Sequence, residues 1–334
     1  MALHTTRRAV LGAALALPAI RAAHAEVSEV LISRQFGTLY LQQDVMETHK
    51  LIEKHGSAMG LPNLKASYLR FAGTSAIQEA LLAGSLHFAS GGVPGALLLW
   101  DKTRGAMKSA FAMNATNQRL LTVNPALKTI RDLTPQDRIA MPAVRVSPQA
   151  IFLQMAAAKL FGPSEWARFD AQTITRAHPD SMAQMLSKSE INCHFSSTPF
   201  QDRELAMPGV HELANSYDIQ GVEVSTPNTI YASSAFRAAN PIAWRATLAA
   251  FQEATDWIVK NPKDAAELYL KSSGDKDTVQ GVMAAMSAPG NLFTLKPAGV
   301  QGVAAFMAET GIIKRRPDNL ADLFFPEAAE SGGS

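Results

Sequence analysis

The chain has 334 residues, of which 47% are hydrophobic and 18% are charged, enough apolar material for one large domain or two lobes. Its formal charge is only +2 and it has no long basic run, which argues against a nucleic-acid partner. The single cysteine, Cys193, excludes an internal disulfide and a metal site built from several cysteines.

The first 25 residues have the three parts of an export signal. Arg7-Arg8 precedes an apolar stretch that ends at Ile20, too short to span a bilayer, and Ala23-His24-Ala25 is a small-x-small cleavage site. The arginine pair, with Arg21 just before the cleavage site, favours a twin-arginine route. We expect cleavage after Ala25, a periplasmic location, and a formal charge that falls from +2 to −1 in the mature chain.

Strand and helix patterns alternate over the first part of the mature chain. Their periods predict strands at 27–32, 64–71 and 86–90, and helices at 39–55, at 75–84 and from Pro94 onward. Ser75 and Gln78 have the spacing of a capping box, and Gly84 supplies the helix stop. This βαβαβα order predicts a mostly parallel sheet covered by helices.

A second α/β unit follows an extended stretch at 108–123. The pattern predicts strands at 138–141, 173–176 and 191–195, and helices at 148–162, at 181–186 and from Thr198-Pro199 onward. Ser147 is expected to cap the first of these helices, and His178-Pro179-Asp180 to form a turn.

The C-terminal third reads as helical. Asn240-Pro241 and Asn261-Pro262 are each expected to cap a helix. One face of the first helix carries apolar residues at helical spacing and is expected to face the core: Trp244, Leu248, Phe251 and Ile258.

The order of these elements predicts an α/β fold with two lobes and C-terminal helices. Residues 26–112 and 226–330 would form lobe 1, and residues 113–225 would form lobe 2. The extended segments near 112–123 and 222–233 would cross between the lobes, and 331–334 would be a disordered tail.

Candidate ligand-binding residues lie in the segments that follow the strands, because ligands of open α/β sheets bind beyond the carboxyl ends of the strands. The candidates are Arg34, Gln35, Phe36, Gly73, Thr74, Ser75, Gly91, Gly92, Asn114, Arg145, Ser147, His178, His194, Phe195, Ser196, Ser197 and Tyr217.

These loops are rich in glycine and hydroxyl groups, and several lead directly into helices. Helix N-termini that converge on one cleft bind an anionic group through unpaired N–H donors. Arg34 or Arg145 could add a charge-assisted contact, and Phe36, Phe195 and Tyr217 could wall an apolar part of the ligand. Each hydroxyl residue also has a plain explanation as a helix cap, and His194 as a hydrogen-bonded core residue.

Patterns for catalysis or metal binding are absent from the sequence. Cys193 and His194 are adjacent in a predicted strand, so their side chains point to opposite faces. The sequence has no G-x-S-x-G and no G-x-x-x-x-G-K-[ST] motif. His49 and Glu53 share a helix face that is expected to be solvated. We therefore expect no enzyme activity, no cofactor and no metal site.

Three stretches resemble a known family. The segment 73–89 looks like the family's helix with EAL-x-x-G followed by a short strand, 194–201 looks like an HF-[ST]-S-x-PFQ stretch, and 240–266 is similar to the C-terminal helices. The chain thereby resembles the periplasmic solute-binding proteins of nitrate/sulfonate/taurine-type ABC transporters, which are related to thiamine-pyrimidine-precursor binding proteins. It departs from them at His87, where Asp is common, and at 189–192, where Gly-x-x-Asp is usual.

The resemblance implies a type II periplasmic-binding-protein fold, whose two lobes close on the ligand by a hinge. It implies a monomeric, non-catalytic protein that delivers a small ligand to the membrane permease of an ABC importer. The expected ligand is a sulfonate, nitrate or carboxylate anion.

Three alternatives stay open on the same fold. The ligand could be a neutral pyrimidine-like heterocycle stacked on aromatic residues. The protein could instead be an enzyme of the pyrimidine-synthesis type, or a sensory domain that feeds a membrane receptor.

Overall fold

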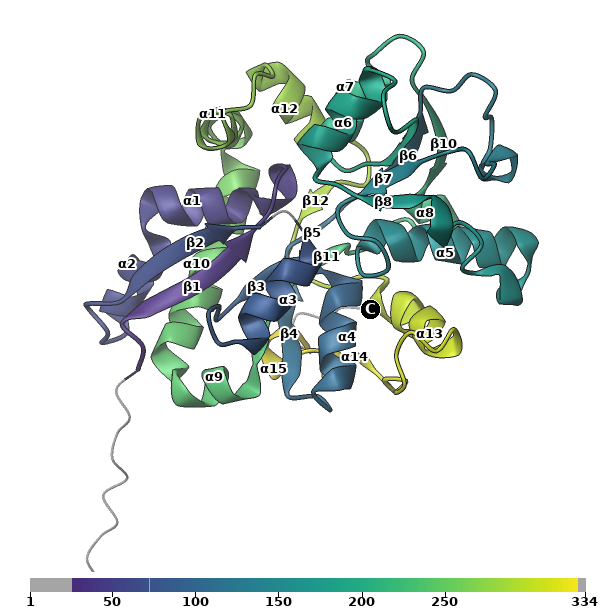
Figure 1. The fold of residues 1–334 in the computed structure, drawn as a ribbon. Helices are drawn as coiled ribbons and strands as arrows, with labels where there is room; N and C mark the ends of the chain where they lie inside the picture. Colours follow the sequence, from purple (N-terminus) through teal and green to yellow (C-terminus); the bar gives the residue numbers. More distant parts are fainter. Residues whose placement is uncertain (1–25, 72, 330–334) are drawn as a thin grey trace, which may run out of the picture.

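The structure is a computed structural model that describes residues 26–71 and 73–329. The predicted export signal and the predicted disordered tail lie outside the described residues. Two groups of strands, each covered by helices, lie on opposite sides of the molecule (Figure 1). We call them the first lobe and the second lobe.

The first lobe contains the N-terminal strands and most of the C-terminal helices. β1 and β2 are parallel, and an Ile32–Phe88 bridge joins them to the three-stranded sheet β3-β11-β4. Its strands are β1 (Glu29–Arg34), β2 (Lys65–Arg70), β3 (Ala89–Gly92), β4 (Met107–Ala112) and β11 (Asn228–Ser233). Its helices are η1 (Thr38–Tyr40), α1 (Leu41–His49), α2 (Leu51–Ala58), α3 (Thr74–Leu82), α4 (Val93–Lys102), α9 (Ser234–Ala239), α10 (Pro241–Lys260), α11 (Pro262–Ser273), α12 (Val279–Met286), α13 (Val300–Glu309), α14 (Leu320–Leu323) and α15 (Pro326–Ala329).

The second lobe is built on one five-stranded sheet with the order β10-β6-β9-β7-β8. Its strands are β6 (Arg119–Thr122), β7 (Ile139–Met141), β8 (Thr173–Thr175), β9 (Cys193–Phe195) and β10 (His211–Asn215). Its helices are η2 (Ile130–Asp132), α5 (Pro148–Phe161), η3 (Pro163–Glu165), η4 (Asp170–Gln172), α6 (His178–Leu186), α7 (Phe200–Leu205) and α8 (Ser216–Gln220).

The chain crosses between the lobes in both directions. It leaves β4 through β5 (Asn114–Ala115), which pairs with β12 (Leu292–Phe293), enters the second lobe at β6, and returns between α8 and β11. The residue boundaries given above for the two lobes stay a prediction.

The predicted parallel arrangement is confirmed for the N-terminal strands, where β1 pairs in parallel with β2 and Ile32 bridges in parallel to Phe88 just before β3, but each lobe also contains one antiparallel strand. Parallel pairing joins β1 to β2 and β7 to β8 and β9, whereas β11 and β6 run antiparallel to their neighbours. β6 and β11 belong to the segments that connect the lobes. Each enters its sheet directly from the other lobe, and it runs opposite to the strands beside it. Neither β10 nor α8 was predicted.

Several helix boundaries also differ from the prediction. The expected single helix at 39–55 breaks at Lys50, whose φ of 49° is left-handed. Apolar residues continue at helical spacing on both sides of Lys50, so the break leaves no trace in the pattern. The third predicted strand lies at Ala89–Gly92 rather than 86–90.

The helix starts decide which residues can reach a ligand. α3 begins at Thr74 with Gly73 as its N-cap residue, and Ser75 is an exposed residue inside the helix rather than its cap. His178 opens α6 instead of forming a turn. Thr198 does not cap α7, because its hydroxyl donates to Asp202 Oδ2 at 2.7 Å. The predicted cap of α5 is confirmed: Ser147 Oγ accepts from the Ala150 N–H at 3.2 Å.

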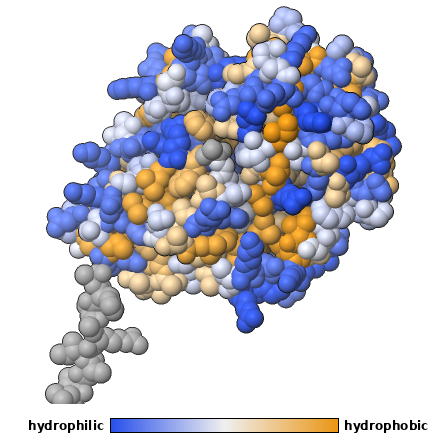
Figure 2. Space-filling view, in the orientation of Figure 1, coloured by the Kyte–Doolittle hydropathy of each residue, from blue (hydrophilic) through white to orange (hydrophobic). Residues whose placement is uncertain are grey.

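The largest core cluster is organised around α10. Trp244 stacks on Phe88 with ring centroids 5.2 Å apart, and Phe251 meets Phe111 edge-on at 5.0 Å. Both residues, and Ile258, are buried as the sequence predicts, and Leu248 packs against the same cluster. Figure 2 shows polar residues over most of one face, with apolar residues gathered near the middle and lower left of that view. Within the described residues, no helix is long and apolar enough to cross a membrane.

Truncating the core of α10 should destabilise the whole protein. Phe251 is fully buried, so we expect Phe251→Ala to lower the free energy of unfolding by about 3–5 kcal/mol through lost burial and the cavity left behind. Val259 lies on the same helix and is 63% exposed, so Val259→Ala should change it by less than about 0.5 kcal/mol. Urea titration of both variants measures their free energies of unfolding. Equal losses of stability in the two variants would contradict this assignment of the core.

Candidate functional site

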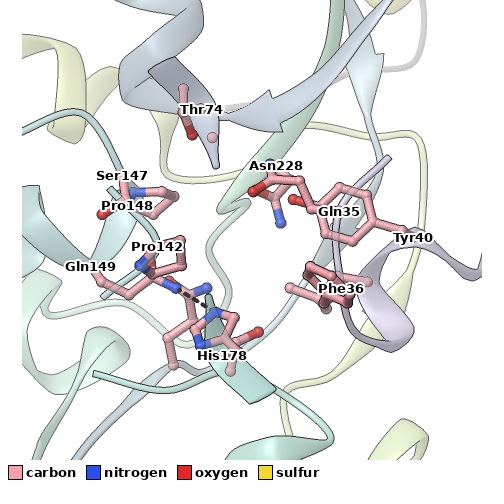
Figure 3. Close-up of a pocket in the computed structure, with 14 residues that line it drawn as sticks. Gln35, Phe36, Tyr40, Thr74, Pro142, Ser147, Pro148, Gln149, His178 and Asn228 are labelled. Carbon is pink, nitrogen blue, oxygen red and sulfur yellow. Dashed lines mark hydrogen bonds between the residues drawn. The ribbon is translucent and has the colours of Figure 1, made fainter. Parts of the chain in front are cut away.

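A small cavity lies where the two lobes meet (Figure 3). Its volume is about 30 Å³, room for about two water molecules. The first lobe contributes Gln35, Phe36, Leu39, Tyr40, Thr74, Gly92 and Asn228. The second lobe and the segment leading into it contribute Gln118, Pro142, Ser147, Pro148, Gln149, His178 and Ser197. Each lobe therefore supplies half of the residues in the wall.

Four helices begin at this cavity. Thr74 opens α3, Gly92 is the N-cap residue of α4, Ser147 is that of α5, and His178 opens α6. Each helix N-terminus carries a partial positive charge and N–H groups without a partner in the helix. The wall contains no Lys, Arg, Asp or Glu side chain, so backbone dipoles are its main fixed charges.

Two carboxamide oxygens in the wall are buried without a hydrogen-bond partner among the described residues. They are Oε1 of Gln118 and Oε1 of Gln149. A buried polar atom without a partner costs stability. A bound molecule that donates to these oxygens, or an amide rotation that turns N–H₂ toward an acceptor, would remove that cost.

Three glycines of the first lobe lie directly against the second lobe. A Cβ added to Gly73 would lie 2.5 Å from the Pro142 carbonyl oxygen, and one added to Gly92 would lie 2.6 Å from Pro148 Cδ. At Gly37 the Cβ would lie 2.9 Å from the Thr198 carbonyl oxygen. Real Cβ atoms do not approach other atoms this closely, so only glycine allows the lobes to meet as they do.

A wider groove adjoins the cavity and shares Gln35 and Phe36 with it. The groove has a volume of about 310 Å³ and is lined by apolar Met182 and Phe200 as well as by charged residues. The Arg70 guanidinium lies 5.1 Å from the Phe36 ring centroid at this groove. On its far side the Arg203 guanidinium forms a bidentate pair with Asp275, at 2.7 and 2.8 Å.

Behind His178 lies a chain of buried titratable groups. His178 Nδ1 is 2.8 Å from His194 Nε2, and His194 Nδ1 is 2.6 Å from Glu204 Oε1. On the cavity side, His178 Nε2 is 3.4 Å from Gln149 Nε2, the dashed contact in Figure 3. Burial holds the pKa of His178 well below its usual value, and the neighbouring His194 lowers it further.

The structure places seven of the candidate residues in the cavity wall. They are Gln35, Phe36, Thr74, Gly92, Ser147, His178 and Ser197. Gly73 lies beside them at the contact with Pro142.

The two candidate arginines lie outside the cavity wall. Arg34 Nη1 pairs with Asp44 at 2.7 Å and with Glu47 at 2.6 Å, and Arg145 is exposed to solvent. Their expected contact with an anion is therefore not part of this arrangement. The acidic partners of Arg34 lie in the first and second turns of α1, which follows it.

The remaining candidates lie outside the wall. Asn114 donates to the Leu39 carbonyl, and the Tyr217 hydroxyl donates to the Gly290 carbonyl. Phe195 and Ser196 are fully buried, Gly91 packs against Tyr231, and His194 contacts His178.

Sequence reasoning missed seven residues of the wall. They are Leu39, Tyr40, Gln118, Pro142, Pro148, Gln149 and Asn228. Pro148 and Gln149 follow the predicted cap Ser147, so the first turn of α5 could have been included. Gln118 and Asn228 lie in the segments that connect the lobes, where no local pattern marks a binding residue. Among the residues that the structure describes, no group of three or more His, Cys, Asp or Glu side chains is arranged to hold a metal ion.

No family model matches the sequence, and no curated protein is significantly similar to it. Solved structures do share the fold. The alkanesulfonate-binding protein SsuA from Xanthomonas axonopodis pv. citri, bound to MOPS, matches with a TM-score of 0.70 at 16% identity, over 91% of this chain and 98% of that chain.

Two further structures give the same result. The nitrate-binding protein NrtA from Synechocystis PCC 6803 matches with a TM-score of 0.66 at 15% identity, over 92% of this chain and 89% of that chain. A Candida albicans protein described as having the generic periplasmic-binding-protein fold matches with a TM-score of 0.67 at 10% identity, over 87% and 92%. The predicted α/β fold is confirmed: this chain has the fold of the periplasmic binding proteins.

Proposed function

We propose that this protein is an exported solute-binding protein that captures a small anion between its lobes and delivers it to the permease of an ABC importer. The observation that carries the proposal is the cavity itself, which is walled equally by both lobes and faced by four helix N-termini. The shared fold and the export-signal pattern support it.

The chemistry of the wall favours an anion. Thr74, Ser147 and Ser197 bring hydroxyl donors, and the helix ends bring N–H donors and positive potential. No carboxylate lines the cavity to repel a negative ligand. Helix N-termini and hydroxyls can hold an anion without a direct arginine contact, so the positions of Arg34 and Arg145 are compatible with this proposal.

The two compartments indicate the shape of the ligand. The inner cavity of about 30 Å³ suits a compact head group, and the adjoining groove of about 310 Å³ could take an organic tail beside Phe36 and Phe200. A sulfonate or carboxylate with such a tail would use both compartments. Nitrate would use the inner cavity alone.

A second candidate is a neutral heterocycle of the pyrimidine type. Phe36 and Tyr40 provide aromatic surfaces at the cavity, and the wall carries carboxamides from Gln35, Gln118, Gln149 and Asn228. Carboxamides offer both donors and acceptors, which a heterocycle could match. We place it second because it leaves the convergence of four helix N-termini without a role.

A thermal-shift screen separates these ligand classes. We expect nitrate, alkanesulfonates or aromatic carboxylates to raise the melting temperature, because a ligand at about 100 times its Kd stabilises the native state by about 2.7 kcal/mol. Gln149→Ala should weaken the response, whereas Arg145→Ala, at an exposed position outside the wall, should leave it unchanged. A response to pyrimidines alone would favour the second candidate, and a loss with Arg145→Ala would contradict the proposed site.

Glycine replacements test whether binding requires the close approach of the lobes. Gly73 and Gly92 have backbone angles open to any residue, so Gly73→Ala and Gly92→Ala should fold normally and yet keep the lobes apart. We expect Kd to rise about 10-fold to 100-fold, since overpacking costs about 1–3 kcal/mol.

Gly302 in α13 is the matched control. A Cβ there meets nothing within 4 Å, so Gly302→Ala should leave Kd unchanged and stabilise the helix slightly. Small-angle scattering should show the Gly92 variant more open than the parent protein in the presence of ligand. Unchanged affinity in both interlobe variants would argue against capture by closure.

A further inference from the structure

The buried chain of His178, His194 and Glu204 links the cavity to the interior of the second lobe. His178 is 7% exposed, and His194 and Glu204 are 0% exposed. Each comes from a different element: α6, β9 and α7. The hydrogen bonds of 2.8 and 2.6 Å connect ring nitrogen to ring nitrogen and then to a carboxyl oxygen, with no gap.

Other charged groups on the surrounding elements are engaged elsewhere or exposed. Arg119 on β6 pairs with Glu212, Asp202 on α7 accepts from Thr198, and Asp180 on α6 is exposed. Arg203 on α7 pairs with Asp275, Arg176 after β8 pairs with Glu190, and the Cys193 thiol on β9 contacts Thr122. The second oxygen of Glu204 has no partner among the described residues, so His194 is its main counterpart.

Two proton arrangements that differ by one added proton show how both hydrogen bonds can be satisfied. In the first, neutral His194 donates from Nδ1 to the Glu204 carboxylate and accepts at Nε2 from His178 Nδ1–H. His178 Nε2 is then an acceptor toward the cavity. In the second, His194 carries an added proton and donates from both nitrogens, to Glu204 and to His178 Nδ1. Neutral His178 then presents Nε2–H to the cavity, and the Gln149 carboxamide, whose Nε2 lies 3.4 Å from His178 Nε2, has to rotate so that two donors do not face each other.

An anion in the cavity favours the second arrangement for two reasons. It needs a donor, and His178 Nε2 becomes one only when the chain holds the extra proton. The wall has no Lys or Arg, and in the first arrangement the buried Glu204 carboxylate adds a second negative charge behind the anion, which a proton taken up on His194 neutralises. The low pKa of His178 agrees with this distribution, since His178 stays neutral in both arrangements.

We propose that His194 and Glu204 are positioning residues that turn His178 into a hydrogen-bond donor for the bound anion, with uptake of one proton per ligand. The inference rests on the proposed function, since it assumes that the anion occupies this cavity. Glu204 stabilises the added positive charge, and His194 carries it. A ligand that presented a donor to His178 would bind the first arrangement with no proton uptake.

Proton uptake has a definite consequence for affinity. Because the complex holds more protons than the free protein, anion affinity falls as pH rises. The limiting slope is a tenfold increase in Kd per pH unit, reached where the free chain is in the first arrangement and the complex in the second.

Titration calorimetry on the purified wild-type protein tests the inference directly. Nitrate and methanesulfonate are the probes, because neither titrates between pH 6 and 8.5 and any proton taken up goes to the protein. Measurement in two buffers that differ in ionisation enthalpy, neither a sulfonate, gives the number of protons. We expect uptake approaching one proton over part of this range, with Kd rising by up to tenfold per pH unit.

Variants test whether the proton is taken up by the His178–His194–Glu204 chain. Glu204→Gln keeps the size and one acceptor but removes the charge, so the pH dependence should flatten. His178→Gln should flatten it and also weaken binding. Glu165→Gln is the matched control, the same change at an exposed ion pair with Arg168 in the same lobe, and should retain the full slope.

The outcomes separate this inference from the proposed function. Anion binding with no proton uptake and a flat pH profile in the wild type overturns the role of the chain and leaves anion capture standing. Binding of neither probe, or of any other anion, overturns both. The wild-type measurement decides the matter even if Glu204→Gln does not fold.

Discussion

The close contact of the two lobes at Gly73 and Gly92 is the constraint on which the cavity depends. Pro142 and Pro148 of the second lobe occupy the space where any other residue would place a Cβ. The helix N-termini of both lobes thereby meet around a volume of only about 30 Å³. A cavity this small leaves little room for bulk water, so polar groups in its wall must find partners in the protein or in a ligand.

Because the lobes meet so closely, the charge of a bound anion must be balanced inside the cavity. A site that excludes water cannot hold an ion without a counterbalancing charge. No arginine lines this cavity: Arg34 is paired with Asp44 and Glu47, Arg203 is paired with Asp275, and Arg70 lies at the adjoining groove. The remaining sources of positive charge are the helix dipoles and a proton on the buried histidines. Under the proposal above, His178 can act as a donor or as an acceptor, whereas an arginine can only donate.

The mixed sheets explain how one chain builds both walls. Because β6 and β11 connect the lobes, the segment before β6 contributes Gln118 to the cavity and the start of β11 contributes Asn228. These residues lie where the lobes are joined: Gln118 exchanges hydrogen bonds with Ser216, and Asn228 pairs with Gly92 of β3. A fixed backbone between the two lobes suits these side chains to the ligand contact proposed above.

Features that depend on a short segment could be predicted from the sequence. The Ser147-Pro148 start of α5, the buried face of α10 and the order of strands and helices all follow from capping, φ restriction and hydrophobic period, which act within a few residues. Seven of the wall residues were found in this way, because strand-to-helix loops meet at one edge of a sheet.

Tertiary structure decided the rest. Whether Arg34 faces a ligand depends on Asp44 and Glu47 on the next helix, and the break of the first helix at Lys50 interrupts no apolar period. The His178–His194–Glu204 chain joins three elements whose spacing in sequence carries no signal. The sequence by itself determined most of the segments that form helices and strands, since those preferences are local. Which of their side chains share a cavity was settled only by packing between the lobes, because those contacts join residues far apart in the chain.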